Sequence, residues 1–461
     1  MSEEKMLKTI NPTTGKPIKD YKMMTTDEMN TAVKSCHEAF LKWKNKPAEE
    51  RAKVISIIGK KLDEYKEELA ELMTKEMGKL TKQGIQEVEL CSGICDYTAK
   101  TGPAGLQDEE RKLADGGKGY ITYSPLGVIY GIQPWNFPAY QVVRYSIASL
   151  MAGNGILLKH SEGVTGSALL LEKIYLEAGL PENLFKVLLI SHDQSDAVIE
   201  HKLVRGVTLT GSPAAGRIIG KKAGENLKKS VLELGSNDAY LVLEDADINL
   251  AVKTCVVGRT YNNGETCVAA KRFIVVEKVY DQFKKAFVEQ MSQLKAGDPT
   301  KDDSDIGPIA RKDLREELHV QVEESVKKGA KVLCGGKIPD GDGFFYPATV
   351  LDNLEPGMPA YDDELFGPVA SLIKAKDTND AMRIANSSRF GLGGGIFSKD
   401  EEKARELAQY HFDTGMISIN SFGLAKPDMP FGGVKDSGFG REHGGFGLHE
   451  FVNVKAIMFA S

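Results

Sequence analysis

Between residues 127 and 243, short and almost wholly apolar segments alternate with segments of helical length. A strand without polar alternation is typical of a parallel sheet that helices cover on both faces. A second alternation of the same kind extends from about residue 240 to about residue 420. The sequence therefore predicts an α/β fold with two such domains, whose sheets bind ligands at the carboxyl ends of their strands. The strands expected in the second block are 239–243, 272–276, 346–351, 369–374, 394–397 and 416–419, and the helices are 278–294, 311–328, 378–386 and 400–411.

The first hundred residues predict helices. Thr25 and Glu28 stand three residues apart before an apolar periodicity, the pattern of a capping box. Apolar side chains at helical spacing from Val54 to Leu72 predict one further amphipathic helix. Residues 107–125 alternate like an exposed hairpin, which is either an arm that adds to another sheet or subunit or a plain surface ribbon. The final apolar strand, 451–459, is expected to pair, because an open edge strand promotes aggregation.

Composition limits the class of protein. Of 461 residues, 41% are hydrophobic and 27% are charged, as in an ordinary globular protein. The net charge of −6 argues against a nucleic-acid partner. No segment approaches the ~20 apolar residues of a membrane span, and the N-terminus lacks the apolar run of a signal peptide, so we expect a cytoplasmic protein. Six cysteines without a Cys-x-x-Cys pair predict neither a disulfide framework nor a metal site.

Cys267 is a candidate nucleophile. It follows Asn263, Gly264 and Thr266, a composition typical of a loop that enters a helix. A helix N-terminus lowers the pKa of a thiol and directs backbone N–H groups at a developing oxyanion. The alternative is a small buried side chain, the usual role of a free cysteine in a reducing compartment.

Glu233 is a candidate general base. It interrupts an apolar strand end, where burial would raise the pKa of its carboxyl group. An exposed position at the strand edge is the alternative.

Gly211 and Ser212 lie between a strand and a helix, where free N–H groups suit a phosphate; a plain turn is the alternative there. Trp135 and Asn136 lie in a loop fixed by flanking prolines, and the amide could donate to an oxyanion.

Taken together, these segments resemble the aldehyde dehydrogenase superfamily over nearly the whole chain, and within it they look most like succinate-semialdehyde dehydrogenases. Several motifs in the same order make this resemblance specific. The motifs are Pro134-Trp135-Asn136-Phe137-Pro138, Leu158-Lys159, Thr210-Gly211-Ser212, Leu232-Glu233-Leu234-Gly235, Gly264-Glu265-Thr266-Cys267, Glu364-Leu365-Phe366-Gly367-Pro368 and the glycine-rich segment from Pro430 to Glu442.

The resemblance implies a Rossmann-like NAD(P)-binding domain formed by 1–106 and 126–234, and a catalytic domain over 235–428. It also implies an oligomerisation arm, formed by 107–125 and 429–461, in a homodimer or homotetramer. The implied activity is NAD(P)-dependent oxidation of an aldehyde to a carboxylic acid, with succinate semialdehyde as the expected substrate.

In the implied mechanism, the Cys267 thiolate attacks the aldehyde, and the Asn136 amide with the Cys267 backbone N–H holds the oxyanion. Loss of hydride leaves a thioester, which water activated by Glu233 hydrolyses. Relatives that transfer the acyl group to coenzyme A lack this glutamate. The resemblance further implies a cofactor cleft lined by Trp135, Lys159, Glu162, Gly211, Ser212, Gly216, Leu234, Glu364 and Phe366.

Two assignments of specificity follow from the resemblance. The carboxylate of Glu162 would repel a 2′-phosphate and favours NAD, although it does not exclude NADP. Arg144 is expected to hold the distal carboxylate of the substrate. Tyr261 stands where some relatives have a second arginine, and Arg259 lies two residues away. The alternatives are a broad-range aliphatic aldehyde dehydrogenase, a catalytically silent structural relative and a thioesterase that needs no nucleotide.

Overall fold

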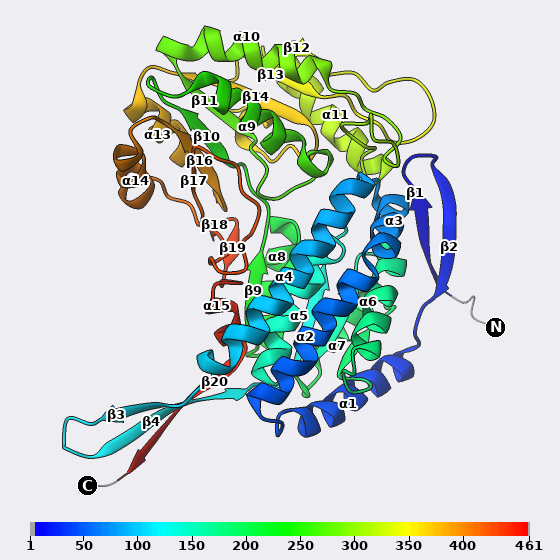
Figure 1. Cartoon of the computed structure of the whole chain (residues 1–461). Coiled ribbons are helices and arrows are strands. Elements are labelled where there is room, and N and C mark those ends of the chain that lie inside the picture. The colour runs from blue at the N-terminus through cyan, green and yellow to red at the C-terminus, as the bar shows by residue number, and fades with distance from the viewer. Residues whose placement is uncertain (1–4, 460–461) are drawn as a thin grey trace.

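The computed structural model describes residues 5–459. Two α/β lobes lie one above the other, and a thin three-stranded arm projects from the lower lobe (Figure 1). The outermost residues of the predicted terminal ranges, 1–4 and 460–461, lie outside the described part of the chain.

The first sheet forms the core of the lower lobe and has the strand order β19-β9-β8-β5-β6-β7. Its strands from β5 to β9 are parallel, as predicted, while β19 is antiparallel to β9. The strands are β5 (Val128–Gln133), β6 (Gly155–His160), β7 (Phe185–Val187), β8 (Val204–Thr210), β9 (Lys229–Glu233) and β19 (Gly438–Phe439), and the helices between them are α5 (Tyr140–Ala152), α6 (Thr165–Glu177), α7 (His192–Glu200) and α8 (Pro213–Glu225).

The second sheet forms the upper lobe, with the order β12-β13-β14-β11-β10-β16-β17 and one antiparallel pair, β12 with β13. Its elements confirm the second predicted alternation, although α9, β12 and the short α12 were not anticipated. They are β10 (Ala239–Val242), α9 (Ile248–Thr260), β11 (Arg272–Val276), α10 (Glu277–Gln293), α11 (Lys312–Lys327), β12 (Lys331–Cys334), β13 (Thr349–Asp352), α12 (Pro359–Asp362), β14 (Val369–Ala375), α13 (Thr378–Asn386), β16 (Gly394–Phe397), α14 (Glu401–Tyr410) and β17 (Ser418–Ile419).

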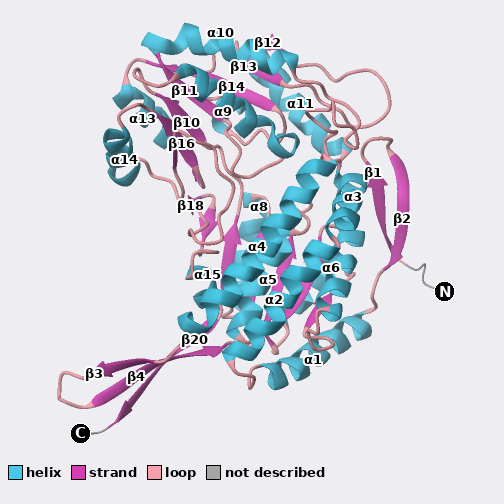
Figure 2. Ribbon diagram, in the orientation of Figure 1, coloured by secondary structure: helices cyan, strands magenta, loops and turns pink. Residues whose placement is uncertain are grey.

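The first N-terminal helix packs on the face of the first sheet that carries Val128 and Tyr130, whereas the helices that follow it pack over α5 and α6 on the opposite face (Figure 2). The capping box at Thr25 is present at the start of α1 (Thr26–Trp43). The prediction of one helix from Val54 to Leu72 was wrong, because Tyr65 leaves helical geometry and separates α2 (Ala48–Glu64) from α3 (Lys66–Met77). A hairpin of β1 (Met6–Asn11) and β2 (Lys16–Lys22), absent from the prediction, lies at the side of the molecule.

The predicted hairpin and the final strand form one sheet. The strand β4 (Lys118–Pro125) pairs with both β3 (Glu109–Lys112) and β20 (Val452–Phe459), which leaves β20 at an edge. The segment 429–461 does more than complete this arm, because β19 joins the first sheet and β18 (Val434–Lys435) pairs with β15 (Phe390–Gly391). The boundaries of the domains remain a prediction.

A buried ion pair anchors the loop that follows β5. Lys79 and Glu87, the latter in α4 (Thr81–Gly105), form a salt bridge with almost no exposure to solvent. The other Glu87 oxygen accepts hydrogen bonds from the backbone N–H groups of Ala139 and Tyr140, each at 2.9 Å. The Lys79 ammonium also lies 4.0 Å from the centroid of the Phe137 ring. The helical layer therefore fixes the start of α5.

We expect Glu87→Ala to lower the free energy of unfolding by about 3–5 kcal/mol, because it leaves a buried ammonium without its partner. Urea denaturation measures the loss. Glu89→Ala is the matched control: Glu89 lies on the same helix, pairs with Lys66 at the surface and should change the stability by about 0.5 kcal/mol or less. Equal effects of the two substitutions would contradict the anchoring role of Glu87.

Candidate active site

Cys267 lies in a tight turn that precedes β11. The prediction of a helix start at this cysteine was wrong, because the chain forms a short 3₁₀ turn, η2 (Tyr261–Gly264), and then extends without a helix. Asn262, Asn263 and Gly264 have φ values of 54°, 59° and 75°. A Cβ on Gly264 would come within 2.4 Å of the backbone of Gly367, so glycine is required for both its dihedral angle and its close contact.

The Asn136 loop from the first sheet meets this turn from the second sheet. The side-chain Nδ2 of Asn262 donates to the backbone oxygen of Asn136 at 2.9 Å and to that of Glu265 at 3.1 Å. The Asn136 Nδ2 donates to the same Glu265 oxygen at 3.0 Å. One Asn136 amide hydrogen therefore remains free for a ligand, since a primary amide carries two.

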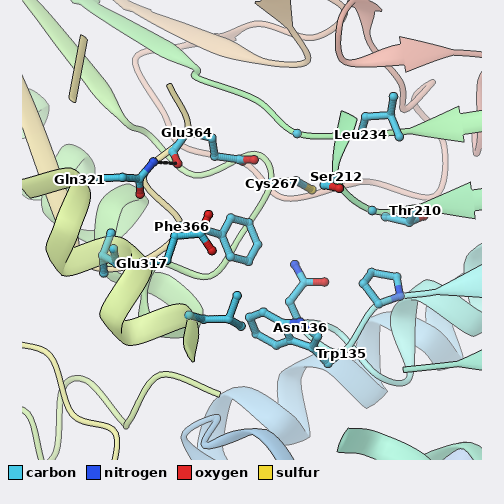
Figure 3. Close-up of a pocket in the computed structure, with 15 residues that line it drawn as sticks. Trp135, Asn136, Thr210, Ser212, Leu234, Cys267, Glu317, Gln321, Glu364 and Phe366 are labelled. Atoms are coloured by element: carbon cyan, nitrogen blue, oxygen red, sulfur yellow. Dashed lines mark hydrogen bonds between the residues drawn. The ribbon is translucent and has the colours of Figure 1, made fainter. Parts of the chain in front are cut away.

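Cys267 and Asn136 border a common pocket of about 270 Å³ between the two lobes. Figure 3 shows the Asn136 amide, the Phe366 ring and the Cys267 sulfur around the same open space. The Trp135 ring meets Phe366 edge to face, with 5.8 Å between the ring centroids. The lining residues are Pro134, Trp135, Asn136, Thr210, Gly211, Ser212, Leu234, Gly235, Cys267, Leu314, Glu317, Leu318, Gln321, Glu364 and Phe366.

The Cys267 thiol is partly buried and is neutral in this surrounding. Burial raises its pKa to about 12, while the cations of Arg144 and Lys271 oppose the rise and the carboxyl groups of Glu364 and Glu233 add to it. The expectation of a lowered thiol pKa is therefore not met in the protein alone. No helix begins at Cys267, so the helix N-terminus that was expected to lower the thiol pKa is absent.

Glu233 ends β9 and is only 2% exposed. Burial raises the pKa of its carboxyl group well above the usual range, and Arg144 opposes the shift. Neither carboxyl oxygen has a hydrogen-bond partner among the described residues. One of them would lie 2.8 Å from a Cβ placed on Gly432, so this glycine leaves space beside the carboxyl group. Glu233 does not line the pocket itself, although Leu234 and Gly235 do.

A larger cavity of about 720 Å³ adjoins the first, and Trp135 and Gly211 line both. Lys159, at the end of β6, lines this cavity with Glu162. Lys159 is 7% exposed, and its ammonium has no hydrogen bond or ion pair with any residue in 5–459. Burial lowers the Lys159 pKa, and Glu162 opposes this. A buried cation that faces a cavity without an internal partner suits a polar or anionic ligand.

Other predicted cofactor residues take different positions. Ser212 caps α8, where its Oγ accepts a hydrogen bond from the Ala215 N–H at 3.2 Å. Gly216 lines neither cavity; a Cβ there would lie 2.5 Å from Leu234, so it allows α8 to pack against that side chain. Glu364 accepts from the Ser236 N–H at 3.0 Å and forms an ion pair with Lys271.

The structure does not bring the two predicted substrate residues to either cavity. Arg144 is 2% exposed and forms an ion pair with Glu442, and its Nη2 donates to Thr210 Oγ1 at 2.9 Å. The Tyr261 hydroxyl donates to Gln86 at 3.3 Å. Arg259 is fully buried and donates to the Gly264 oxygen at 2.6 Å, which supports the turn before Cys267.

A third cavity, of about 480 Å³, is lined by Val268, the residue that follows Cys267. Met416 and Leu424 line it, and they pack with Cys267 against the cluster of Val268, Leu392 and Phe431. Its lining includes one lysine, Lys426, whose side chain has no ion pair among the described residues. The thiol lines the first pocket, and residues of the cluster against which it packs line this third cavity.

Sequence reasoning missed Lys271, Ser236 and Glu442 as residues of this site. Lys271 could have been noticed in the sequence, because a lysine and an arginine interrupt an otherwise apolar segment at the start of β11. Glu442 is the last residue of the glycine-rich motif that begins at Pro430, but no function was predicted for it.

Within residues 5–459 no helix has the length and apolar character that crossing a bilayer requires, and no cluster of three potential metal ligands occurs there.

The sequence is similar to those of known proteins over nearly its whole length. The model of the aldehyde dehydrogenase family matches residues 1–457. Succinate semialdehyde dehydrogenase [NAD(P)+] Sad of Escherichia coli is 42% identical over 97% of each chain, and succinate-semialdehyde dehydrogenase [NADP(+)] of Deinococcus radiodurans is 39% identical over 98% of this chain and 95% of that one.

A solved structure gives the same result for the fold. Succinic semialdehyde dehydrogenase of Streptococcus pyogenes, in complex with NADP+, superposes with a TM-score of 0.96 at 36% identity, covering 99% of this chain and 100% of that one. The match spans both sheets and the arm, which confirms the predicted fold class. The chain belongs to the aldehyde dehydrogenase family.

Proposed function

We propose that this protein oxidises succinate semialdehyde to succinate with NAD(P)+. The observation that carries the chemistry is the shared pocket of Cys267 and Asn136, with the buried carboxyl group of Glu233 behind it. A sulfur nucleophile, an amide donor and a base in one place are the requirements of acyl chemistry at a carbonyl carbon.

In this proposal the Cys267 sulfur, once deprotonated, attacks the aldehyde carbon. The free amide hydrogen of Asn136 and the Cys267 N–H donate to the oxyanion that forms. NAD(P)+ bound in the cleft would accept the hydride that leaves the carbon, and Cys267 then holds the acyl group as a thioester. The pocket walls of Trp135 and Phe366 limit the access of water to this step.

Glu233 then acts as general base in our proposal. Its raised pKa makes its carboxylate a stronger proton acceptor than that of an exposed glutamate, and both oxygens are free to bind a water molecule. That water attacks the thioester carbon, one of its protons passes to Glu233, and the carbon–sulfur bond breaks to release the Cys267 thiolate and the carboxylic acid, which loses its remaining proton to solvent. The presence of Glu233 favours hydrolysis over transfer to coenzyme A.

For the cofactor we propose the larger cavity together with Glu364 and Phe366. The unpartnered ammonium of Lys159 supports this fit, since it can donate to ribose hydroxyls or to a phosphate. The sequence favoured NAD because of Glu162, but relatives in E. coli and D. radiodurans are named for NAD(P)+ and NADP(+). We therefore propose that the enzyme accepts NADP+ as well as NAD+, with Lys159 offsetting the charge of Glu162.

Succinate semialdehyde is proposed because of the names of the relatives. Arg144 is held by Glu442, so we place the distal carboxylate of the substrate in the third cavity, where Lys426 supplies a positive charge.

We also propose that the arm mediates homo-oligomerisation. Its edge strand β20 carries apolar side chains that are largely exposed, among them Val454 at 59% and Met458 at 72%, and such an edge is suited to pairing with another chain.

The thiol should react slowly in the enzyme without cofactor. Because burial raises the pKa of Cys267 to about 12, the thiolate fraction grows about tenfold for each pH unit below that value. We expect the alkylation rate with iodoacetamide to rise without a plateau between about pH 6 and about pH 10. Mass spectrometry of the Cys267 peptide measures it, and a plateau near neutrality would contradict the burial of the thiol.

Glu233→Gln should separate the two halves of the reaction. We expect a first-turnover burst of NAD(P)H close to that of the parent, followed by a steady-state rate lowered about 100-fold or more, because the general base is lost. Stopped-flow absorbance measures both phases. Cys267→Ala is the control and should show no burst. Loss of the burst in Glu233→Gln would mean that Glu233 acts before the thioester forms.

A panel of two aldehydes and two cofactors tests the substrate and cofactor assignments. We expect kcat/KM for succinate semialdehyde to exceed that for hexanal by about tenfold or more, because a charged contact is worth about 1.5–3 kcal/mol, and we expect turnover with both NAD+ and NADP+. Preference for hexanal would leave a broad-range aliphatic enzyme as the better description. Turnover without either nucleotide would indicate a thioesterase.

A further inference from the structure

A buried lysine lies directly behind the nucleophile. Lys271 is 2% exposed, and its Nζ donates to the Cys267 oxygen at 2.6 Å, to the Thr266 oxygen at 3.1 Å and to Ser236 Oγ at 2.8 Å. It also lies 3.2 Å from a carboxyl oxygen of Glu364. Ser236 Oγ in turn donates to the Cys267 oxygen. The ammonium therefore has acceptors for all three of its hydrogens.

The bond to Thr266 orients one peptide group of the site. The Thr266 carbonyl and the Cys267 N–H belong to the same planar peptide, and in a trans peptide they point in opposite directions. An ammonium on the carbonyl side therefore directs the N–H away from Lys271, and the residue that carries this N–H, Cys267, lines the pocket. A charged donor on the oxygen also polarises the peptide, which strengthens the N–H as a donor.

The charge of Lys271 acts on the sulfur as well. The charged groups that face the thiol are Arg144 from α5, Lys271, Glu233 from the end of β9 and Glu364, while Asp238 faces Lys271 from the start of β10. Both cations are paired, Arg144 with Glu442 and Lys271 with Glu364. Lys271 is the one that lies in the same chain segment as the thiol and donates to the backbone oxygen of Cys267.

We propose that Lys271 is a positioning residue that orients and polarises the Cys267 peptide as the oxyanion donor and that favours the thiolate by its charge. This deepens the proposed function, on which its role toward the oxyanion rests. The effect on the thiol does not depend on the identity of the aldehyde or of the cofactor. The two effects can be measured separately.

Lys271→Met replaces the ammonium with an uncharged chain of similar length. We expect iodoacetamide to alkylate Cys267 about tenfold more slowly at fixed pH, because one pKa unit changes the thiolate fraction tenfold. We expect a larger fall, of about 100-fold, in the rate of the first-turnover NAD(P)H burst, because the oxyanion donor is weakened as well. Alkylation is measured without aldehyde or cofactor, so its outcome stands even if the proposed function fails.

Conservative variants separate charge from packing. Lys271→Arg keeps a charged donor and should restore alkylation to within about threefold of the parent, whereas Lys271→Gln keeps a donor without charge and should remain slow. Lys228→Met is the matched control, because Lys228 also donates to two backbone oxygens, those of His201 and Val204 at 2.6 Å, away from the pocket. It should leave both rates unchanged.

Two results would overturn the proposal. One is alkylation at the parental rate in a Lys271→Met variant whose thermal unfolding shows that it is folded. The other is equal alkylation rates in the Arg and Gln variants. If Lys271→Met does not fold, the Arg and Gln comparison alone decides between the outcomes.

Discussion

The side-chain amide of Asn262 holds together two loops that come from different sheets. It binds the backbone oxygens of Asn136 and Glu265, and the Asn136 amide binds the second of these oxygens as well. Each such bond contributes only about 1 kcal/mol to stability. Their combined effect is geometric, since an oxyanion donor must be placed within about 0.5 Å of its working position. The relation between Asn136 and Cys267 depends on this contact.

The surroundings of the site disfavour the ionised forms of both reacting groups in the protein alone. Burial raises the pKa of both Cys267 and Glu233, while Arg144 and Lys271 oppose it. The same low-polarity surroundings that suppress ionisation strengthen every electrostatic contact once charge develops on the substrate. A buried cation network behind the sulfur therefore acts where solvent screens little.

Much of the fold was predictable because its signal is local. The parallel strands β5, β6 and β8 are mostly apolar and are buried on both faces over most of their length, and a capping box marks the start of α1. The break at Tyr65 was missed because apolar spacing continues across it. The helix start at Cys267 was predicted wrongly because consecutive left-handed residues make a tight turn with the same Asn and Gly composition.

By itself, the sequence determined the α/β class, the arm and the motifs that identify the family, because apolar periodicity and short motifs are properties of neighbouring residues. Only the tertiary structure decided that Glu442 engages Arg144, and that Ser236, Lys271 and Glu364 meet behind Cys267. These contacts join residues far apart in the chain, and their distances depend on how the sheets and loops pack, which no local pattern records.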